Sequence, residues 1–373
     1  MIDILEIRNS NRVVIGVIDT AKSVIWKQNY YGTGDFEIYI TASPETFALL
    51  TVGNYVTRSN DRNIGIIERV EVTYTIQDGR MIIASGRFAK ALLGRRIIYN
   101  LVSKSIRPVV SSGNVETAVR KLVNDNMIAA TDAARNLSFF ELGAVAGITE
   151  TIVDDTGTAA KKQTSFENLL EYTDSVLGEY GIGAYVGIDR ETLQLQYNVY
   201  KGANRSTGNA SGNNPVVFSQ EFDNLISSTY YYDDKTQKNA VLIGGEGEGT
   251  ERFFTLLVSS ATGINRREMF VDASNQSKTY REGETDVVYT DAEYQSILVT
   301  RGKQELSNYI PEEHFSGAVD ITNAMHKYGV DFLIGDIVTV QDNEIGKYIN
   351  TRIVAVTEIQ DDSGYQINVE FGV

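Results

Sequence analysis

The chain has two histidines, His314 and His326, and no cysteine. A zinc site needs ligands at short spacings such as His-Glu-x-x-His, and neither histidine belongs to one. The Gly-x-Ser-x-Gly turn that presents a serine nucleophile in many hydrolases is also missing. We therefore expect neither histidine to be catalytic. Without cysteine the sequence predicts no disulfide and no thiolate metal site.

A glycine-rich run, Gly244–Gly249, is the one stretch whose composition suggests phosphate binding. It lacks the Gly-Lys-(Ser/Thr) ending of a P-loop, and Glu246 and Glu248 would repel a phosphate. Glycine also serves where the backbone turns tightly or approaches another element closely. We expect that structural use here.

Short charged pairs occur in segments that read as turns. Calcium prefers carboxylate oxygens, but none of the acidic pairs has EF-hand spacing, so solvated turns are expected. The arginine pairs are expected to be surface or interface charges. The pairs are Asp154-Asp155, Asp233-Asp234, Asp361-Asp362, Arg95-Arg96 and Arg266-Arg267. The sequence thus assigns no catalytic, cofactor-binding or metal-binding residue, although a metal in an acidic turn and a pair of glycosidase carboxylates stay open.

The C-terminal segment predicts a three-strand antiparallel meander. Alternation in its middle strand places Ile353 and Glu358 on opposite faces, and Asp362–Gly364 reads as a hairpin turn. The strands are expected in three β-branched segments, Asp331–Val340, Thr351–Ile359 and Gln366–Phe371.

The same pattern occurs near the N-terminus. Gly53–Thr57 matches Gly335–Thr339, and Gly65–Thr73 matches the middle strand. Asp78-Gly79 is the turn, and Arg80–Gly86 is the return strand. We interpret this as one small β-barrel used twice, at the two ends of the chain. The alternative is that any two β-meanders look alike.

Helical periodicity is confined to the segments between these ends. Asn114 is a good N-cap for Val115–Asp125, Ser165 for Phe166–Leu177, and Asp291 for a helix over residues 292–309. The predicted fold is therefore mainly β (α+β), with two small antiparallel β-barrels at the chain ends and mixed α/β inserts.

This pattern predicts four domains. Residues 1–100 form the first barrel, and residues 101–215 form a mixed α+β insert. Residues 216–259 and 315–373 together form a discontinuous second barrel, and residues 260–314 form a helix-bearing insert. A chain of 373 residues is indeed too long for one ordinary domain.

Composition excludes several classes of protein. No run approaches the ~18–20 apolar residues of a membrane span, and the chain opens with strand-like sequence rather than a signal peptide. The net charge of −15 argues against sequence-independent binding of nucleic acid.

Charge is unevenly spread between the two ends. Residues 1–100 carry 12 basic and 10 acidic side chains, net +2, whereas residues 317–373 carry 3 basic and 9 acidic ones, net −6. If the barrels touch in an assembly, this asymmetry favours unlike neighbours. The alternative is two differently solvated surfaces.

Several stretches together resemble bacteriophage tail proteins of the Siphovirus ReqiPepy6 Gp37-like family, which are related in architecture to T4-type baseplate hub proteins. They occur in the family's order over nearly the whole chain. The stretches are Ile25-Trp26, Tyr30-Tyr31, Gly34–Glu37, Gly65–Glu68, Leu92–Ile97, Asn239–Gly249 with Arg252, Arg267–Asp272, Gly335–Thr339 and Phe371-Gly372.

The resemblance implies a non-enzymatic tail hub without cofactors. In such hubs a homotrimer with two barrels per chain builds a pseudo-sixfold ring that joins the tail tube to the tail tip. The implied partners are other copies of the chain, a distal tail or tail-tube protein, and tip or fibre proteins. No specific nucleic-acid binding and no integral membrane contact are expected. The implied location is the virion, at the tail tip or baseplate, after synthesis in the bacterial host cytoplasm.

Two other functions stay open at this point. A cell-wall hydrolase of the tail tip would carry a catalytic domain beyond a hub-like part, and the chain's end in the second barrel at Val373 is expected to leave no room for one. A carbohydrate-binding receptor protein would stack sugars on the tyrosine-rich strands, since tyrosines outnumber phenylalanines 21 to 14.

Overall fold

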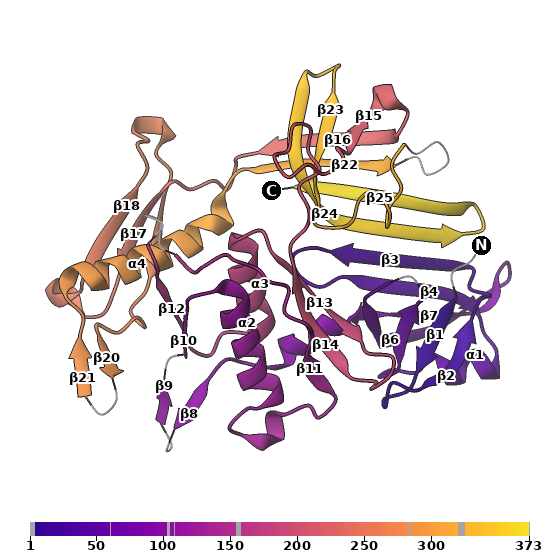
Figure 1. Cartoon of the computed structure of the whole chain (residues 1–373), viewed down its shortest axis with the longest axis horizontal. Helices are drawn as coiled ribbons and strands as arrows, with labels where there is room; N and C mark the ends of the chain where they lie inside the picture. The colour runs from indigo at the N-terminus through magenta and orange to yellow at the C-terminus, as the bar shows by residue number, and fades with distance from the viewer. Residues whose placement is uncertain are drawn as a thin grey trace. The chain divides into compact units, whose positions relative to one another are not determined.

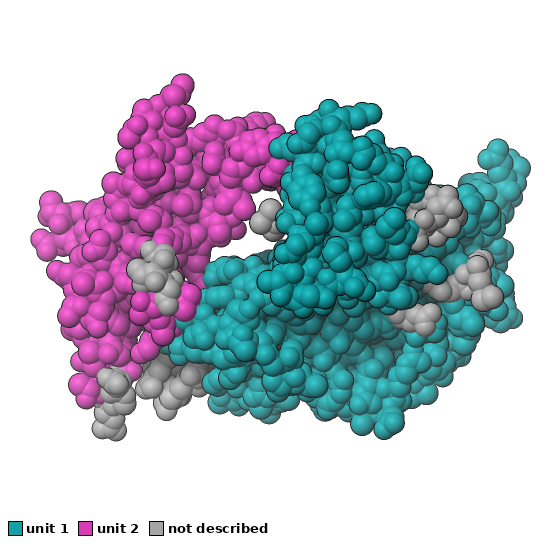
Figure 2. All heavy atoms as spheres, turned by 45° about the horizontal axis from the view of Figure 1, so that its top comes forward, with its two compact units in different colours: residues 1–152, 163–229, 315–373 teal, residues 153–162, 230–314 magenta. Residues whose placement is uncertain are grey.

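The computed structural model describes residues 4–59, 61–102, 105–107, 109–153, 158–282, 285–319 and 325–372. The fold is mainly β, with several sheets and short helices (Figure 1). Contacts divide the chain into two compact units (Figure 2). Unit 1 comprises residues 1–152, 163–229 and 315–373, and unit 2 comprises residues 153–162 and 230–314. Among the described residues, no helix has the length and apolar character needed to cross a membrane.

The first strand set fills the N-terminal part of unit 1. Its strands pair in the order β3-β4-β7-β6-β5-β1-β2. In β3 and β4 alternate side chains are buried, and Trp26 packs against Phe36 and Phe88 in the core of this strand set. The strands are β1 (Leu5–Arg8), β2 (Val14–Ile18), β3 (Ser23–Asn29), β4 (Asp35–Thr41), β5 (Tyr55–Arg58), β6 (Ile64–Thr75) and β7 (Gly79–Phe88). The short helix α1 (Pro44–Leu49) links β4 to β5.

The second strand set pairs in the order β16-β22-β25-β24-β23-β15. Its strands are β15 (Val217–Ser219), β16 (Leu225–Asp233), β22 (Glu312–Val319), β23 (Ile337–Asp342), β24 (Lys347–Asp361) and β25 (Gly364–Gly372). The two sets form one continuous sheet, because β24 pairs antiparallel with β3 from Ala355↔Asn29 to Asp361↔Ser23. We call this pairing the junction.

The repeated meander predicted from the sequence is confirmed in its hydrogen bonds. Gly53 and Gly335 have φ angles of +93° and +95°, a region that favours glycine. The N–H of Gly53 donates to the carbonyl of Ile67 at 2.8 Å, and that of Gly335 donates to the carbonyl of Ile353 at 2.9 Å. Each isoleucine N–H then donates to the carbonyl of the residue after the glycine.

The repeat extends to an irregularity that the alternation pattern did not show. Pairing of β6 with β7 shifts register between Ile67 and Arg69, and pairing of β24 with β25 shifts between Ile353 and Ala355. A β-bulge of this kind moves the following side chains to the other face. The prediction that Glu358 lies opposite Ile353 is therefore wrong, because both side chains are buried.

Strand pairing closes neither set into a barrel among the described residues. The sets also differ at one edge, since β1 pairs antiparallel with β5 whereas β15 pairs parallel with β23. The mainly β class is thus confirmed, and the two-barrel arrangement stays a prediction.

A mixed α/β segment completes unit 1. A three-stranded sheet of order β11-β14-β13 accompanies two helices. Its main elements are α2 (Val115–Val123), β11 (Phe140–Leu142), α3 (Leu169–Glu179), β13 (Gly183–Ile188) and β14 (Leu195–Tyr200). The short elements around them are η1 (Ala89–Arg95), β8 (Asn100–Val102), β9 (Ser105–Arg107), β10 (Val109–Ser112), η2 (Asn124–Ile128), η3 (Ala133–Arg135) and η4 (Gln220–Phe222). The strand β12 (Lys161–Thr164) has its first two residues in unit 2 and its last two in unit 1.

The predicted helix starts are right in one case of three. Asn114 caps α2 by accepting from the Thr117 N–H. For α3 the predicted cap at Ser165 is wrong: Phe166 has φ +65°, and Asn168 caps the helix. For α4 the cap is one residue earlier than predicted, at Thr290 in a capping box.

Unit 2 has its own sheet, of order β18-β17-β19, covered by α4. Its core contains Val241 and Ile243 of β17 and Tyr294 and Leu298 of α4. The elements are β17 (Ala240–Gly244), η5 (Gly249–Glu251), β18 (Phe254–Val258), η6 (Gly263–Asn265), β19 (Glu268–Asp272), β20 (Thr279–Glu282), β21 (Thr285–Val288), α4 (Asp291–Leu306) and η7 (Ser307–Tyr309).

This sheet corrects the range predicted to join the C-terminal strands. Residues 216–259 do not act as one piece: β15 and β16 pair with β23 and β22, whereas β17 and β18 pair with each other and β17 also with β19. The reason is packing. The apolar residues of β17 are buried against the helix that follows in the same unit.

Candidate functional site

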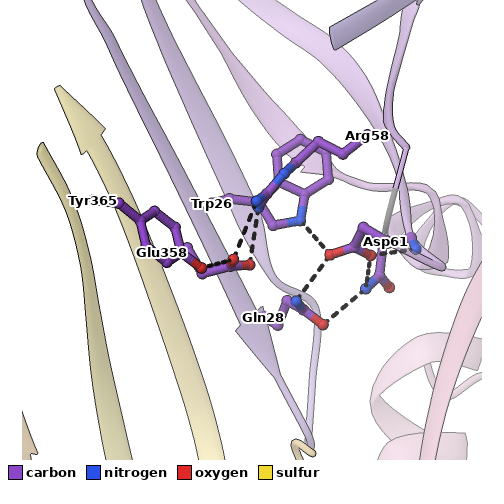
Figure 3. Close-up of polar contacts among 7 residues, drawn as sticks. Trp26, Gln28, Arg58, Asp61, Glu358 and Tyr365 are labelled. Atoms are coloured by element: carbon purple, nitrogen blue, oxygen red, sulfur yellow. Dashed lines mark hydrogen bonds and ion pairs between the residues drawn. The ribbon is translucent and has the colours of Figure 1, made fainter. Parts of the chain in front are cut away.

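A buried ion pair lies at the junction between the two strand sets. Arg58, the last residue of β5, donates from both terminal nitrogens to Glu358 of β24, at 2.9 and 3.1 Å (Figure 3). Both side chains are only 9% exposed. Tyr365 of β25 donates its hydroxyl to the same carboxylate. A bidentate ion pair of this kind fixes the relative orientation of its two side chains and also stabilises the fold.

A second carboxylate, Asp61, lies next to this pair. It accepts from the Trp26 indole N–H at 2.8 Å and from the Gln28 amide at 2.9 Å (Figure 3). Asn63 donates to its other oxygen from the backbone at 2.6 Å and from the side chain at 2.9 Å. Burial raises the pKa of Asp61, and the Asn63 bonds and the Arg58 charge oppose that rise. We call Trp26, Gln28, Arg58, Asp61, Asn63, Glu358 and Tyr365 the junction cluster.

The junction cluster borders a cavity of about 450 Å³. The first strand set contributes Arg58 and Asp61 to the lining, and the C-terminal part of the chain contributes Tyr328, Glu358 and Tyr365. The hollow lies within unit 1 and is lined by residues from both ends of the sequence.

The mixed α/β segment also reaches this region. The Arg62 guanidinium stacks on the rings of Tyr185 and Tyr200, with its carbon 4.4 and 3.7 Å from their centroids. Such stacking is worth about 0.5–2 kcal/mol depending on exposure. Tyr30 is fully buried and donates to the carbonyl of Gly181 at 2.9 Å. Three segments far apart in the sequence are therefore tied together here.

The side chains of the junction cluster hold one another through hydrogen bonds and an ion pair. Asp61 and Glu358 each accept several hydrogen bonds from side chains of the cluster, which occupies the lone pairs that a general base would use. The described residues contain no group of three or more His, Cys, Asp or Glu side chains able to hold a metal ion. The cluster is therefore suited to hold the two strand sets in register.

The two histidines lie in separate parts of the chain. His314 lies in β22. His326 accepts a hydrogen bond at its Nε2 from the Val217 N–H at 3.3 Å and packs edge-on against Phe218. Burial lowers the pKa of His326, and the charge of Asp331 opposes this. An imidazole whose Nε2 is an acceptor is neutral, so this histidine supports the structure.

We expect His326 to make unit 1 less stable in acid. Its pKa in the folded chain lies below the ordinary value of 6.5, so its contribution is present above that value and is lost as pH falls through the folded pKa. In His326→Phe the free energy of unfolding should therefore decline less between about pH 7 and pH 5 than in the wild type. Denaturant titrations followed by tryptophan fluorescence measure this. Parallel declines would contradict it.

The glycine run has the structural use expected from the sequence. The Arg252 guanidinium donates to the carbonyls of Gly244 and Gly245, and a Cβ at Gly244 would lie 2.8 Å from it. A Cβ at Gly245 would lie 2.6 Å from the Tyr294 hydroxyl, which accepts from the Glu246 N–H. Gly247 has a φ angle of +107°, and a Cβ there would lie 2.6 Å from the carbonyl oxygen of Glu251, so a tight turn with close backbone approach explains the glycine at this position.

The charged pairs are turn caps and ion pairs. Asp233 and Asp361 accept backbone N–H groups two residues ahead, as aspartates in turns commonly do. Among the arginines, Arg266 pairs with Glu268, Arg267 with Asp234 and Arg95 with Glu68, and Arg96 donates to the carbonyl of Arg135. Asp154-Asp155 lies outside the described residues.

The sequence analysis missed the junction cluster as a site. One signal was present: Gln28, Glu358 and Gln360 are polar residues in strands rich in apolar ones, and all three are buried. Polar groups inside a sheet are normally hydrogen-bonded, so they indicate a partner from elsewhere in the chain. The sequence could not indicate which partner.

Comparison with known proteins gives a family and a fold. The sequence profile of the family described as Siphovirus ReqiPepy6 Gp37-like protein matches residues 4–373. None of the curated proteins compared with the chain matches it.

Solved structures match over the full length of the chain. A tail protein from Neisseria meningitidis MC58 is 13% identical with a TM-score of 0.57, covering 100% of this chain and 96% of its own. The 43 kDa tail protein of prophage MuSo2 from Shewanella oneidensis is 12% identical with a TM-score of 0.58, at 99% and 98% coverage. A prophage tail protein from Listeria monocytogenes EGD-e is 12% identical with a TM-score of 0.50, at 99% and 94% coverage. At these identities the likeness is one of fold.

Proposed function

The chain belongs to the Siphovirus ReqiPepy6 Gp37-like protein family, and from this premise we propose that it is a structural subunit of a phage tail hub. The observation that carries the proposal is the repeated strand set. Two equivalent halves in one chain let three chains present six similar units, which is what a joint between a sixfold tube and a threefold tip requires. The fold shared with three tail proteins supports this assignment.

In the proposed hub, three copies form a ring in which first and second strand sets alternate, each set contributing a barrel. Residues 1–100 and 101–215 remain the proposed first barrel and insert. The proposed partners are further copies of the chain, a distal tail or tail-tube protein on one side, and tip or fibre proteins on the other. The subunit would act in the virion, at the tail tip or baseplate, without catalysis.

Charges at the junction support the alternation. Lys27 of the first set pairs with Glu370 of the second at 3.4 Å, and Arg58 pairs with Glu358 in the same sense. Basic groups thus come from the end of the chain with net charge +2 and acidic groups from the end with −6. Complementary charge of this kind selects unlike neighbours.

Solution mass and tail labelling test the proposal. Light scattering over a range of concentrations should give a species of three times 41.3 kDa, and electron micrographs should show it as a ring. Antibodies against the chain should label the tip of tails isolated from producing cells. A stable dimer, which cannot build a threefold ring, or labelling along the tube instead of the tip would contradict the proposal.

A further inference from the structure

An apolar stripe lies exposed on β6. The side chains of Val72 and Tyr74 are 46% and 70% exposed, and Ile76, directly after the strand, is 95% exposed. Single exposed apolar residues are common on proteins, but Val72 and Tyr74 lie at alternate positions on one face of the strand, and Ile76 extends the exposed apolar surface beyond its end. The stripe therefore needs an explanation.

The internal repeat shows what covers the equivalent residues in the second strand set. Counting from the matched residues Ile67 and Ile353, Val72 corresponds to Glu358 and Tyr74 to Gln360. Glu358 and Gln360 are only 7% and 8% exposed. Their strand, β24, pairs with β25 on one side and with β3 on the other.

The matching part of β6 has only one of these neighbours. Residues 69–75 pair with β7, whereas β5 pairs with residues 64–66 alone. In the described residues, no strand takes the place beside β6 that β3 takes beside β24. This difference accounts for the exposure of the stripe.

The second strand set contains the matching strand. β16 occupies the end of the order β16-β22-β25-β24, as β3 occupies the end of β3-β4-β7-β6 within the first set. β3 has a partner beyond it, β24, and its residues Val24 and Trp26 are buried. In β16, Ile226 is 70% exposed, and the neighbouring residues Ser227 and Thr229 are also exposed.

We propose that β16 of a second copy of the chain pairs antiparallel with residues 69–75 of β6 and covers the stripe. This pairing repeats between chains the junction that β3 and β24 make within one chain. Three such contacts together with three internal junctions would close the ring, so the inference rests on the proposed function and specifies its interface. Edge strands that present apolar faces are normally paired or covered, which this arrangement achieves.

The contact between chains differs in chemistry from the internal junction. The internal junction joins Arg58 to Glu358. The residues at the equivalent positions, Val340 and Val72, carry no charge, and Val340 is already buried within its own chain while Val72 belongs to the exposed stripe. Where the internal junction is ionic, the contact between chains is therefore apolar. Because salt screens charges and leaves apolar contacts intact, the trimer should persist at high salt.

Disulfide scanning of the full chain tests the pairing directly, because the chain has no cysteine of its own. Val72→Cys is combined in turn with cysteine at Ile226, Ser227, Ser228 and Thr229. Side chains of neighbouring residues in a strand point to opposite faces. Covalent dimers and trimers should therefore form with cysteine at every second position of β16, either at Ile226 and Ser228 or at Ser227 and Thr229, and not at the other two. Val14→Cys, at a similarly exposed valine of β2, replaces Val72→Cys as the control and should not cross-link.

A second variant measures association. Val72→Lys with Tyr74→Lys places two charges in the stripe. The chain concentration at which half of the chains are trimeric should rise at least tenfold. Val14→Lys with Val17→Lys, two exposed valines of β2, should not raise it. A trimer that shows no periodic cross-linking, or that ignores the lysines in the stripe, would overturn this interface and leave the hub proposal standing. A chain that neither cross-links nor trimerises would overturn both the interface and the ring, whereas labelling at the tail tip would still support a tail function.

Discussion

Replacing Arg58 with methionine should lower the free energy of unfolding of unit 1 by about 3 kcal/mol. The loss is large because Glu358, with a side chain only 9% exposed, is left buried without its ion-pair partner. Methionine retains most of the apolar volume of the arginine stem, so the effect reports the lost ion pair rather than a cavity. Trp26 is the only tryptophan and lies beside the pair, which makes its fluorescence a probe of unit 1 during denaturant unfolding.

Two variants isolate this effect. Arg87 makes the same two-pronged bond to Glu68, but its side chain is 52% exposed, so Arg87→Met should cost less than about 1 kcal/mol. Arg58→Val with Glu358→Val copies the valine residues that the repeat has at these positions and should regain part of the loss, because removing both charges leaves neither one buried alone. If Arg58→Met and Arg87→Met lowered the free energy of unfolding equally, the buried pair at the junction would stabilise the fold no more than an exposed pair does.

The meanders were predictable from sequence because their signals are local. Each meander has a glycine, Gly53 or Gly335, before a β-branched run and a second glycine at the start of its return strand. These glycines mark positions where the backbone adopts a positive φ angle, and each signal lies within a few residues. Gly79 and Gly364 indeed have positive φ angles and begin β7 and β25. Such requirements need no knowledge of the rest of the chain.

The junction cluster was not predictable because it depends on distant contacts and on one inserted residue. Arg58 and Glu358 are 300 positions apart in the sequence. Simple alternation places Glu358 on the face opposite Ile353, and only the bulge at Val354 turns it inward. A bulge is set by the pairing of two strands, which a single strand's composition does not reveal.

The start of α3 also depends on a contact that the local sequence does not reveal. Ser165 and Asn168 are both competent N-caps, and composition alone does not choose between them. The structure uses Asn168, whose side chain also donates to the carbonyl of Gly94, a contact across the fold. The tertiary contact therefore decides between two locally equivalent caps.

Gly335→Ala should destabilise unit 1 by about 3 kcal/mol, considerably more than the same change at its counterpart Gly53. Both glycines have nearly the same positive φ angle, so both variants bear the strain of a Cβ in that region, about 1 kcal/mol. At Gly335 the new Cβ would also lie 2.2 Å from the ring of Tyr30. Overpacking of this kind costs a further 1–3 kcal/mol or so.

The comparison works because the repeat supplies its own control. Among the described residues, leaving aside Gly53 itself and its two chain neighbours, no atom lies within 4 Å of a Cβ placed at Gly53, so Gly53→Ala measures backbone strain alone. Tyr30 is fully buried and fixed by its bond to Gly181, and it cannot move aside cheaply. Trimming the ring should therefore rescue the first variant: Gly335→Ala with Tyr30→Leu should lose less than the two single changes added together. Equal losses for Gly335→Ala and Gly53→Ala would mean that Tyr30 yields and that packing around the second meander is looser than its contacts indicate.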